Sequence, residues 1–169
     1  MTVRIYVPTT VAGLRRLLDT EQVQPLSGTA FALTPRLREA YASGDDEELE
    51  YVAMSEAARA SLRLLATELA EDDAAPARRA VVSADVDDVT LRPDLDDAVV
   101  RVAGPIPMSR LAAVHLDLED AGGAVRAAAA VVDAADLGDP DAEFTLGEAE
   151  DHELAWYGVQ ELPFVLELL

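Results

Sequence analysis

The sequence contains no cysteine, no lysine and no asparagine. Without cysteine, the chain forms no disulfide, offers no thiolate nucleophile and builds no cysteine-ligated zinc or iron–sulfur centre. Without lysine, it has neither a Schiff-base residue nor a P-loop lysine. Isoleucine occurs only at Ile5 and Ile106. Because a GC-rich genome imposes such a bias through its codons, we assign the bias no function.

Long apolar runs are also missing. No stretch approaches the roughly 18 apolar residues that a membrane helix needs, and the first ten residues are too short for a signal peptide. Half of the 169 residues are hydrophobic, which is typical of a folded protein rather than a disordered chain. We therefore expect one globular domain over residues 1–169, located in the cytoplasm and not in a membrane.

Positive charge is scarce. The chain carries 13 basic and 33 acidic residues, a net charge of −20. Residues 1–80 hold 9 arginines against 13 acidic residues, whereas residues 81–169 hold 4 against 20. The excess of negative charge creates an electrostatic field that repels nucleic acid and anionic membranes and attracts basic proteins. The simplest interpretation is a solvated acidic surface. Mimicry of nucleic acid, which would capture a DNA-binding protein, is a further hypothesis.

Hydrophobic periodicity predicts the secondary structure. The strongest pattern covers residues 46–70, where apolar residues follow a three-four spacing without an intervening glycine or proline. It predicts a helix about 37 Å long. Further helices are expected at 10–20, 35–44 and 124–136, and strands at 3–7, 29–33, 78–86, 98–104 and 113–118.

The C-terminal quarter gives weaker patterns. Residues 138–151 are predicted to form a loop with a brief strand at 143–146. Beyond Pro163, the residues Phe164, Leu166 and Leu168 alternate with others, which predicts an edge strand. Because so apolar a terminus must dock on its own domain or on another copy, we expect a homodimer formed through the C-terminal segment.

Together these elements predict an α+β fold, with a mixed, mainly antiparallel sheet and helices on one face. Two strand–helix units of similar size begin at Val3 and Val114. They favour a ferredoxin-like or duplicated ferredoxin-like arrangement. A doubly wound parallel sheet is the alternative, and the consecutive strands at 78–104 weigh against it.

Motifs for known chemistry are absent. His152 and Glu153 resemble the first half of a zincin motif, which needs a second histidine at position 156. That position is Trp156, so the motif is excluded. The acidic residues between 136 and 143 lack the register of an EF-hand loop. The sequence holds no G-x-S-x-G, G-x-G-x-x-G or P-loop pattern. We expect no cofactor and no metal ion.

The segment 152–162 gathers scarce side chains, including the only tryptophan and one of two histidines. The simpler interpretation places Trp156 in the core, with the polar tips of His152 and Tyr157 at its edge. The alternative is a small binding pocket rimmed by His152, Trp156, Tyr157 and Gln160.

Two functions are compatible with these patterns. The first is a non-enzymatic cytoplasmic binding or interaction domain whose acidic C-terminal half contacts a basic protein partner. The second is an enzyme of unknown reaction, in which His152 is a general acid or base in a pocket near Trp156. A pocket that holds His152 with Arg36, Arg38 or Arg101 would favour the enzyme.

Three blocks of sequence carry a resemblance to a known family: residues 28–66, residues 133–144 and the segment "HELAWYGVQEL" at 152–162. They resemble an actinobacterial family of small acidic proteins that is classified as a domain of unknown function. The resemblance spans nearly the full chain and implies a single domain. It implies no activity, ligand or functional residue.

Overall fold

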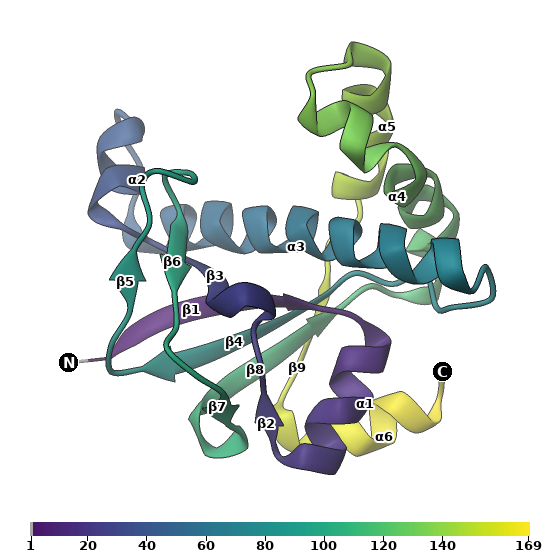
Figure 1. Cartoon of the computed structure of the whole chain (residues 1–169), viewed down its shortest axis with the longest axis horizontal. Coiled ribbons are helices and arrows are strands. Elements are labelled where there is room, and N and C mark those ends of the chain that lie inside the picture. The colour runs from purple at the N-terminus through teal and green to yellow at the C-terminus, as the bar shows by residue number, and fades with distance from the viewer. Residues whose placement is uncertain (1) are drawn as a thin grey trace.

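The computed structural model describes residues 2–169. Its centre is a seven-stranded sheet in the order β5-β6-β3-β1-β4-β8-β9, in which each neighbouring pair is antiparallel (Figure 1). A separate ladder joins β2 to β7. The strands are β1 (Val3–Thr9), β2 (Gln22–Val23), β3 (Thr29–Ala32), β4 (Ala80–Val86), β5 (Thr90–Leu91), β6 (Val99–Arg101), β7 (Ile106–Pro107), β8 (Leu111–Leu116) and β9 (Ala155–Tyr157).

The long predicted helix is confirmed. It begins after Asp45, whose side chain accepts a hydrogen bond from the backbone N–H of Glu48 at 2.9 Å, and acidic residues in its first turn favour the positive end of the helix dipole. No helix within residues 2–169 is long and apolar enough to cross a membrane. The α-helices are α1 (Val11–Thr20), α2 (Pro35–Ala40), α3 (Asp46–Glu71), α4 (Gly122–Asp136), α5 (Pro140–Glu150) and α6 (Leu162–Glu167).

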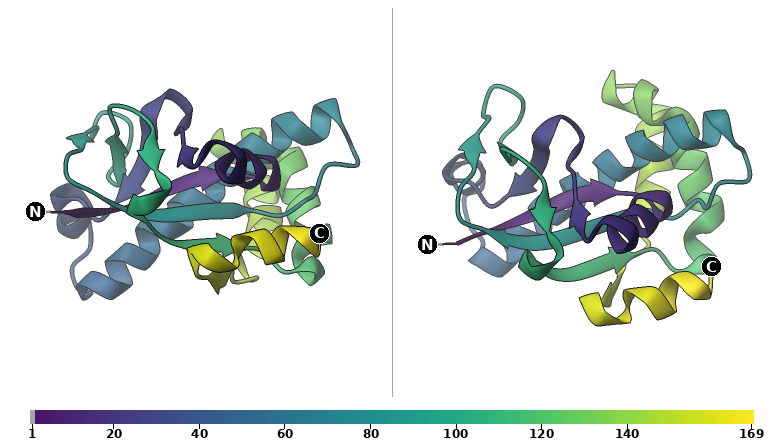
Figure 2. Two further views of the ribbon diagram at one scale, coloured as in Figure 1. Left: turned by 90° about the horizontal axis from the view of Figure 1, so that it is seen from below. Right: turned by 60° about the horizontal axis from the view of Figure 1, so that its bottom comes forward.

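Both faces of the sheet are covered by helices. Ile5 and Val7 of β1 pack with α1 and α6, whereas Tyr6 between them packs with α2 and α3 on the other face. In the views of Figure 2, α1 and α6 lie on the near side of the sheet and α3 lies behind it. The expectation of helices on one face is therefore wrong. Its physical reason is that β1 and β4 are apolar on both sides, so each side needs a cover.

The α+β class and the mainly antiparallel sheet are confirmed. The two predicted strand–helix units do not form βαβ crossovers, because β1 and β3, which flank α1, are neighbouring antiparallel strands, as are β8 and β9, which flank α4 and α5. Strands β3 and β4, which α2 and α3 connect, are parallel to each other with β1 between them. Here β1 lies between β3 and β4 and is antiparallel to both. After α1, the chain turns back through β2 and the turn at Leu26–Gly28 before it enters β3, which reverses the direction of that strand.

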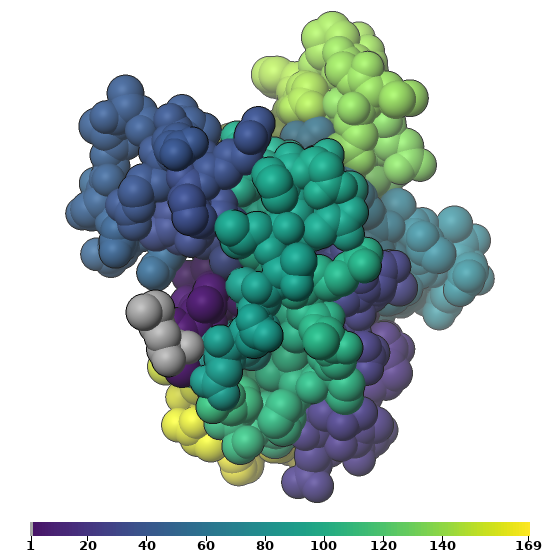
Figure 3. Space-filling view, turned by 60° about the vertical axis from the view of Figure 1, so that its left-hand side comes forward, coloured from purple at the N-terminus to yellow at the C-terminus, as the bar shows by residue number. Residues whose placement is uncertain are grey.

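Helices α4 and α5 form a hairpin on the C-terminal half of α3 and project beyond the sheet (Figures 1 and 3). The expected loop at 138–151 is wrong over most of its length. Asp139 caps α5 by accepting from the N–H of Ala142 at 3.3 Å, and Pro140 occupies the first turn. These are helix-start signals, and Ala142, Leu146 and Ala149 then face the hairpin core.

The expected C-terminal edge strand is also wrong, because the chain forms α6 there. Pro163 stands in its first turn, where a proline needs no hydrogen-bond partner for its nitrogen. Leu162 and Leu166 are four residues apart and bury the same side of the helix against the core shared with α1. The spacing of four residues between Leu162 and Leu166 therefore determines the structure here, and not the two-residue alternation of Phe164, Leu166 and Leu168.

Candidate functional site

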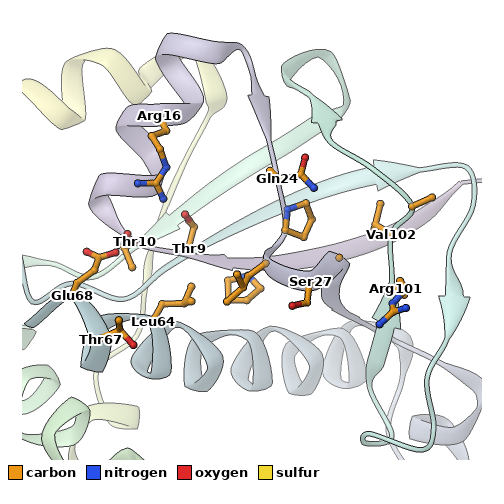
Figure 4. A pocket seen from close by; sticks show the side chains of 15 residues that line it. Thr9, Thr10, Arg16, Gln24, Ser27, Leu64, Thr67, Glu68, Arg101 and Val102 are labelled. Carbon is orange, nitrogen blue, oxygen red and sulfur yellow. Dashed lines mark hydrogen bonds between the residues drawn. The ribbon is translucent and has the colours of Figure 1, made fainter. Parts of the chain in front are cut away.

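A cavity of about 880 Å³ lies between α1, α3 and the end of β6 (Figure 4). Its volume is in the range of small-molecule sites, about 300–1,000 Å³. We call it the α1–α3 cavity. It is lined by Pro8, Thr9, Thr10, Arg16, Gln24, Pro25, Leu26, Ser27, Gly28, Leu64, Thr67, Glu68, Arg101, Val102 and Ala103.

Gly13 brings two polar groups together at one end of this cavity. A Cβ on Gly13 would lie 2.0 Å from Oγ1 of Thr9 and 3.6 Å from Nη2 of Arg16. A side chain at position 13 would therefore displace the Thr9 hydroxyl from its place against the first turn of α1. The guanidinium of Arg16 lies over the same position, so a nearly buried hydroxyl and an exposed cation face one end of the cavity.

Hydrogen bonds fix the elements that form this end. Thr10 caps α1: its hydroxyl accepts from the N–H of Gly13 at 3.2 Å and donates to Oε2 of Glu68 at 2.6 Å. Ser61 of α3, which is fully buried, donates to the carbonyl of Thr9 at 2.7 Å and accepts from the first N–H of β4 at 3.1 Å. Helix α3 is thereby tied to α1 and to the ends of β1 and β4.

A left-handed turn forms the other end. Ser27 has φ of 56° and Gly28 has φ of 71°. A Cβ on Gly28 would lie 2.7 Å from the carbonyl oxygen of Val102 and 3.4 Å from Cγ of Arg101. Glycine therefore permits the close approach of this turn to the end of β6, beside Arg101. A left-handed residue other than glycine is uncommon, and such residues concentrate at ligand sites; Ser27 is one, and it lines the cavity.

The cavity also gathers arginines without acidic partners. Eight of the 13 arginines form ion pairs with carboxylates, and two more, Arg78 and Arg126, donate to backbone carbonyls. Within residues 2–169, the side chains of Arg15, Arg16 and Arg101 make neither contact, and two of these three line the cavity. The lining thus holds two arginines and one glutamate in a molecule whose net charge is −20.

Comparison with known families adds one finding. The model of a family of unknown function, DUF6912, matches residues 3–166. The chain belongs to this family. No curated protein and no solved structure matches it. The family description gives no activity for its members.

The structure divides the sequence-predicted site residues among separate places. His152 lines a small hollow of about 110 Å³ between α3 and the segment before β9. Trp156 lines a neighbouring groove, while Tyr157 packs on the opposite face of the sheet with the core under α1 and α6. Gln160 is exposed in the turn after β9, where its side chain lies against Gly158. The four residues do not rim one pocket.

The interpretation of Trp156 as a core residue is wrong, because 63% of its surface is exposed. It lies on β9, the edge strand of the sheet, opposite His115 of β8. Its groove has a volume of about 520 Å³, and we call it the Trp156 groove. It is lined by Arg4, Tyr6, Glu47, Glu50, Tyr51, Met54, Ser83, Ala112, Ala113, His115 and Trp156.

Of the two histidines, His115 has the more perturbed surroundings. Burial lowers its pKa below the ordinary value of 6.5, and the charge of Arg4 lowers it further. Nε2 of His115 lies 3.3 Å from Oγ of Ser83. The Ser83 hydroxyl is also directed at the carbonyl of Ala113, at 3.4 Å. The distance between Nε2 of His115 and Oγ of Ser83 is long for a base that activates a serine nucleophile.

His152 does not share a pocket with any of the arginines that would favour an enzyme. Its hollow is lined by neither Arg36, Arg38 nor Arg101. Arg79 lines the hollow, but it already binds Asp117 and donates to the carbonyl of His152 at 2.8 Å. Within residues 2–169, no group of three or more histidine or acidic side chains is arranged to hold a metal ion.

The sequence alone does not predict the residues of the α1–α3 cavity. One local signal does precede them: Gly13 stands inside an amphipathic helix, where a glycine costs stability and often marks a close contact. Nothing local distinguishes Arg16 from its neighbour Arg15, or connects either one to Arg101. Only the fold brings them to one cavity.

Proposed function

We propose that the protein is a non-enzymatic binding domain, whose α1–α3 cavity holds a small ligand with acidic groups at both ends. The observation that carries this proposal is the pair of arginines without acidic partners. Arg16 and Arg101 reach the cavity from opposite ends (Figure 4). In a chain with 33 acidic residues, a guanidinium group readily finds an internal carboxylate. Two unpaired groups at one cavity indicate that an external anion is their partner.

The lining also indicates the class of ligand. A guanidinium group binds phosphate or carboxylate through two parallel hydrogen bonds. The hydroxyl of Thr9 beside Arg16, and that of Ser27 within the turn that contacts Arg101, add neutral donors at each end. Glu68 accepts from Thr10 and can accept from a ligand hydroxyl as well. An extended dianion with a hydroxylated middle fits this lining.

Calorimetric titration with inorganic pyrophosphate and with succinate tests the proposal. We expect Arg16→Ala and Arg101→Ala each to weaken binding by about 10–100-fold, since a hydrogen bond to a charged group contributes about 1.5–3 kcal/mol. Both side chains are exposed and unpaired, so these variants should unfold at the same temperature as the parent.

Arg15→Ala is the matched control, because Arg15 is exposed on the same helix but lies outside the cavity. It should leave the affinity unchanged. If neither probe binds the parent protein, or if Arg15→Ala weakens binding as much as Arg16→Ala, the cavity is not an anion site.

We propose binding rather than catalysis because the groups around His152 offer no nucleophile paired with a base. We further propose a cytoplasmic location, an actinobacterial source, a basic protein partner and a homodimer formed through the C-terminal segment. The lack of cysteine supports the first of these and the net charge of −20 supports the third.

A further inference from the structure

The Trp156 groove runs along the N-terminal half of α3, on the side of the helix that faces β8 and β9. The α1–α3 cavity lies at the C-terminal half of α3 instead, where Leu64, Thr67 and Glu68 line it. The two sites share no lining residue. A ligand of the Trp156 groove is therefore distinct from the proposed anion, and neither site depends on the other.

Two large aromatic side chains in the lining of this groove are exposed to solvent. Trp156 is 63% exposed and Tyr51 is 52% exposed, and they come from β9 and α3 respectively. Tryptophan and tyrosine that remain exposed beside a hollow are typical of sites that another molecule covers. Their ring faces carry partial negative charge, so they attract a cation that stacks on them.

The charges at the groove also favour a cation. Glu47 and Glu50 line it, and within residues 2–169 neither forms an ion pair. Arg4 is the one arginine in the lining, and Asp85 already binds it at 2.7 and 3.2 Å. The charge of Glu50 reaches the floor of the groove: burial, followed by that charge, raises the pKa of Tyr6 to about 12.

The groove borders a free edge of the sheet. Within residues 2–169, β9 pairs with β8 on one side only and ends the strand order (Figure 1). An edge strand presents backbone N–H and C=O groups that an extended peptide can pair with. A strand added beside β9 would direct every second side chain to the face on which Trp156 and Tyr51 stand.

We propose that the Trp156 groove binds an extended segment of a basic partner protein. The backbone of this segment pairs with the free edge of β9. A lysine or arginine side chain of the segment stacks on Trp156 and Tyr51 and meets the carboxylates of Glu47 and Glu50. Recognition thus requires both an extended backbone and a basic residue at alternate positions.

Fluorescence titration tests the proposal directly, because Trp156 is the only tryptophan in the chain. The probe is a ten-residue peptide in which arginine and threonine alternate. We expect a saturable change in the emission of Trp156 at low salt, and weaker binding as ionic strength rises. If calorimetry detects binding while the emission of Trp156 stays constant, the peptide binds elsewhere and the proposal fails.

Matched variants separate the groove from general attraction by the acidic surface. Glu50→Gln and Tyr51→Ala should each weaken binding of this peptide by about three- to ten-fold. Glu71→Gln changes the net charge as Glu50→Gln does, at the exposed far end of the same helix, and should have no effect. Equal effects of the two glutamate variants would overturn the proposal.

Two further ligands define the partner. A peptide of the same sequence with alternate backbone nitrogens methylated keeps its charge but cannot donate ladder hydrogen bonds. It should bind at least about ten-fold more weakly, because several charge-independent bonds are lost. Spermidine presents free cations without a peptide backbone, and binding as tight as that of the peptide would replace the protein partner by a small cation. Arg16→Ala should leave peptide binding unchanged, whatever its effect on anions.

Discussion

Arg79 and Asp117 form the most deeply buried ion pair of residues 2–169, with side chains 4% and 0% exposed. Nη2 and Nε of Arg79 donate to the two carboxylate oxygens at 2.8 and 2.9 Å, and the backbone N–H of Arg79 donates to one of them at 2.7 Å. Nη2 also donates to the carbonyl of His152. One guanidinium group therefore joins the start of β4, the end of β8 and the segment that leads into β9.

Removal of one partner leaves a buried charge without compensation. We expect Asp117→Ala to lower the free energy of unfolding by about 3–5 kcal/mol, as for other broken buried pairs. The double variant Arg79→Met with Asp117→Leu should recover much of this loss, since it removes both charges. Urea denaturation followed by circular dichroism measures both.

Asp94→Ala provides the control, because Asp94 pairs with Arg92 at the surface at 2.8 Å. Screening by water makes such pairs contribute little, so this variant should unfold at the parent's urea concentration. An Asp117→Ala variant that is as stable as Asp94→Ala would show that the buried pair does not hold β4, β8 and the β9 segment together.

Hydrophobic periodicity predicts the helices and strands that are long and amphipathic. The helix at 46–70 and the strand at 3–7 are confirmed within two residues at each end. Strands β2, β5 and β7 have two residues each, which is too short for a period to be visible. The sequence predicts a loop where α5 forms, although Asp139 and Pro140 are a helix start, because acidic and small residues there also fit a loop.

The residues of the candidate sites come together only in the fold and leave no local sequence pattern. Arg16 and Arg101 belong to α1 and β6, and the cavity between them depends on a strand order that no local pattern encodes. The sequence favours a core position for Trp156, because large aromatics usually are buried. Its exposure follows from the position of β9 at the sheet edge, which is a property of the whole fold and not of the segment 152–162.

The α4–α5 hairpin depends on a small ionic network with α3. Arg63 donates to Asp136 at 2.8 Å, and Arg59 contacts both Asp136 and Glu143, at 3.1 and 2.8 Å. Hydrogen bonds from Arg63, followed by its charge and by the contact with Arg59, hold the pKa of Asp136 below its ordinary value of 3.8. The network therefore stabilises the ionised carboxylate in the folded state.

Protonation of the Asp136 carboxylate at acid pH should weaken this network. Because the pKa of Asp136 is lower in the folded state, its stabilising effect is complete above pH 3.8 and is lost as the pH falls through the folded value. Asp136→Asn should lower the melting temperature at pH 6 by about 1–4 °C, the size expected for partly exposed pairs. The difference from the parent should shrink as the pH falls below 3.8.

Thermal denaturation between about pH 6 and about pH 3 measures this convergence. Asp133→Asn serves as control, because Asp133 is exposed on the same helix and forms no ion pair within residues 2–169. A difference between Asp136→Asn and the parent that persists unchanged at the acid end would contradict the assignment of this stabilisation to the carboxylate.

For the whole molecule, α3 separates the two proposed binding surfaces. The arginines of the α1–α3 cavity lie on its β6 side, and the carboxylates and aromatics of the Trp156 groove lie on its β8–β9 side. A net charge of −20 gives the molecule a field that attracts cations over most directions. An anionic ligand therefore has to overcome that field to reach Arg16 and Arg101, so its association should become faster as salt rises.

Helix α6 presents an apolar surface through which two copies of the chain could associate. Leu162 and Leu166 dock α6 on its own chain, but Phe164 and Leu168 on the outer side are 70% and 86% exposed. We expect these two side chains to form the centre of a symmetric contact between two copies. Because each copy carries the same large negative charge, the dimer should become tighter as salt is added.

Sedimentation equilibrium at micromolar protein concentration, in low and high salt, measures this association. The double variant Phe164→Ser with Leu168→Ser should sediment as a monomer at both salt concentrations, since it removes the apolar contact and keeps the net charge. Leu137→Ser is the control: Leu137 is 89% exposed, but it lies between α4 and α5. A parent protein that is monomeric at high salt excludes the dimer, and a loss of association in Leu137→Ser moves the contact to the α4–α5 hairpin.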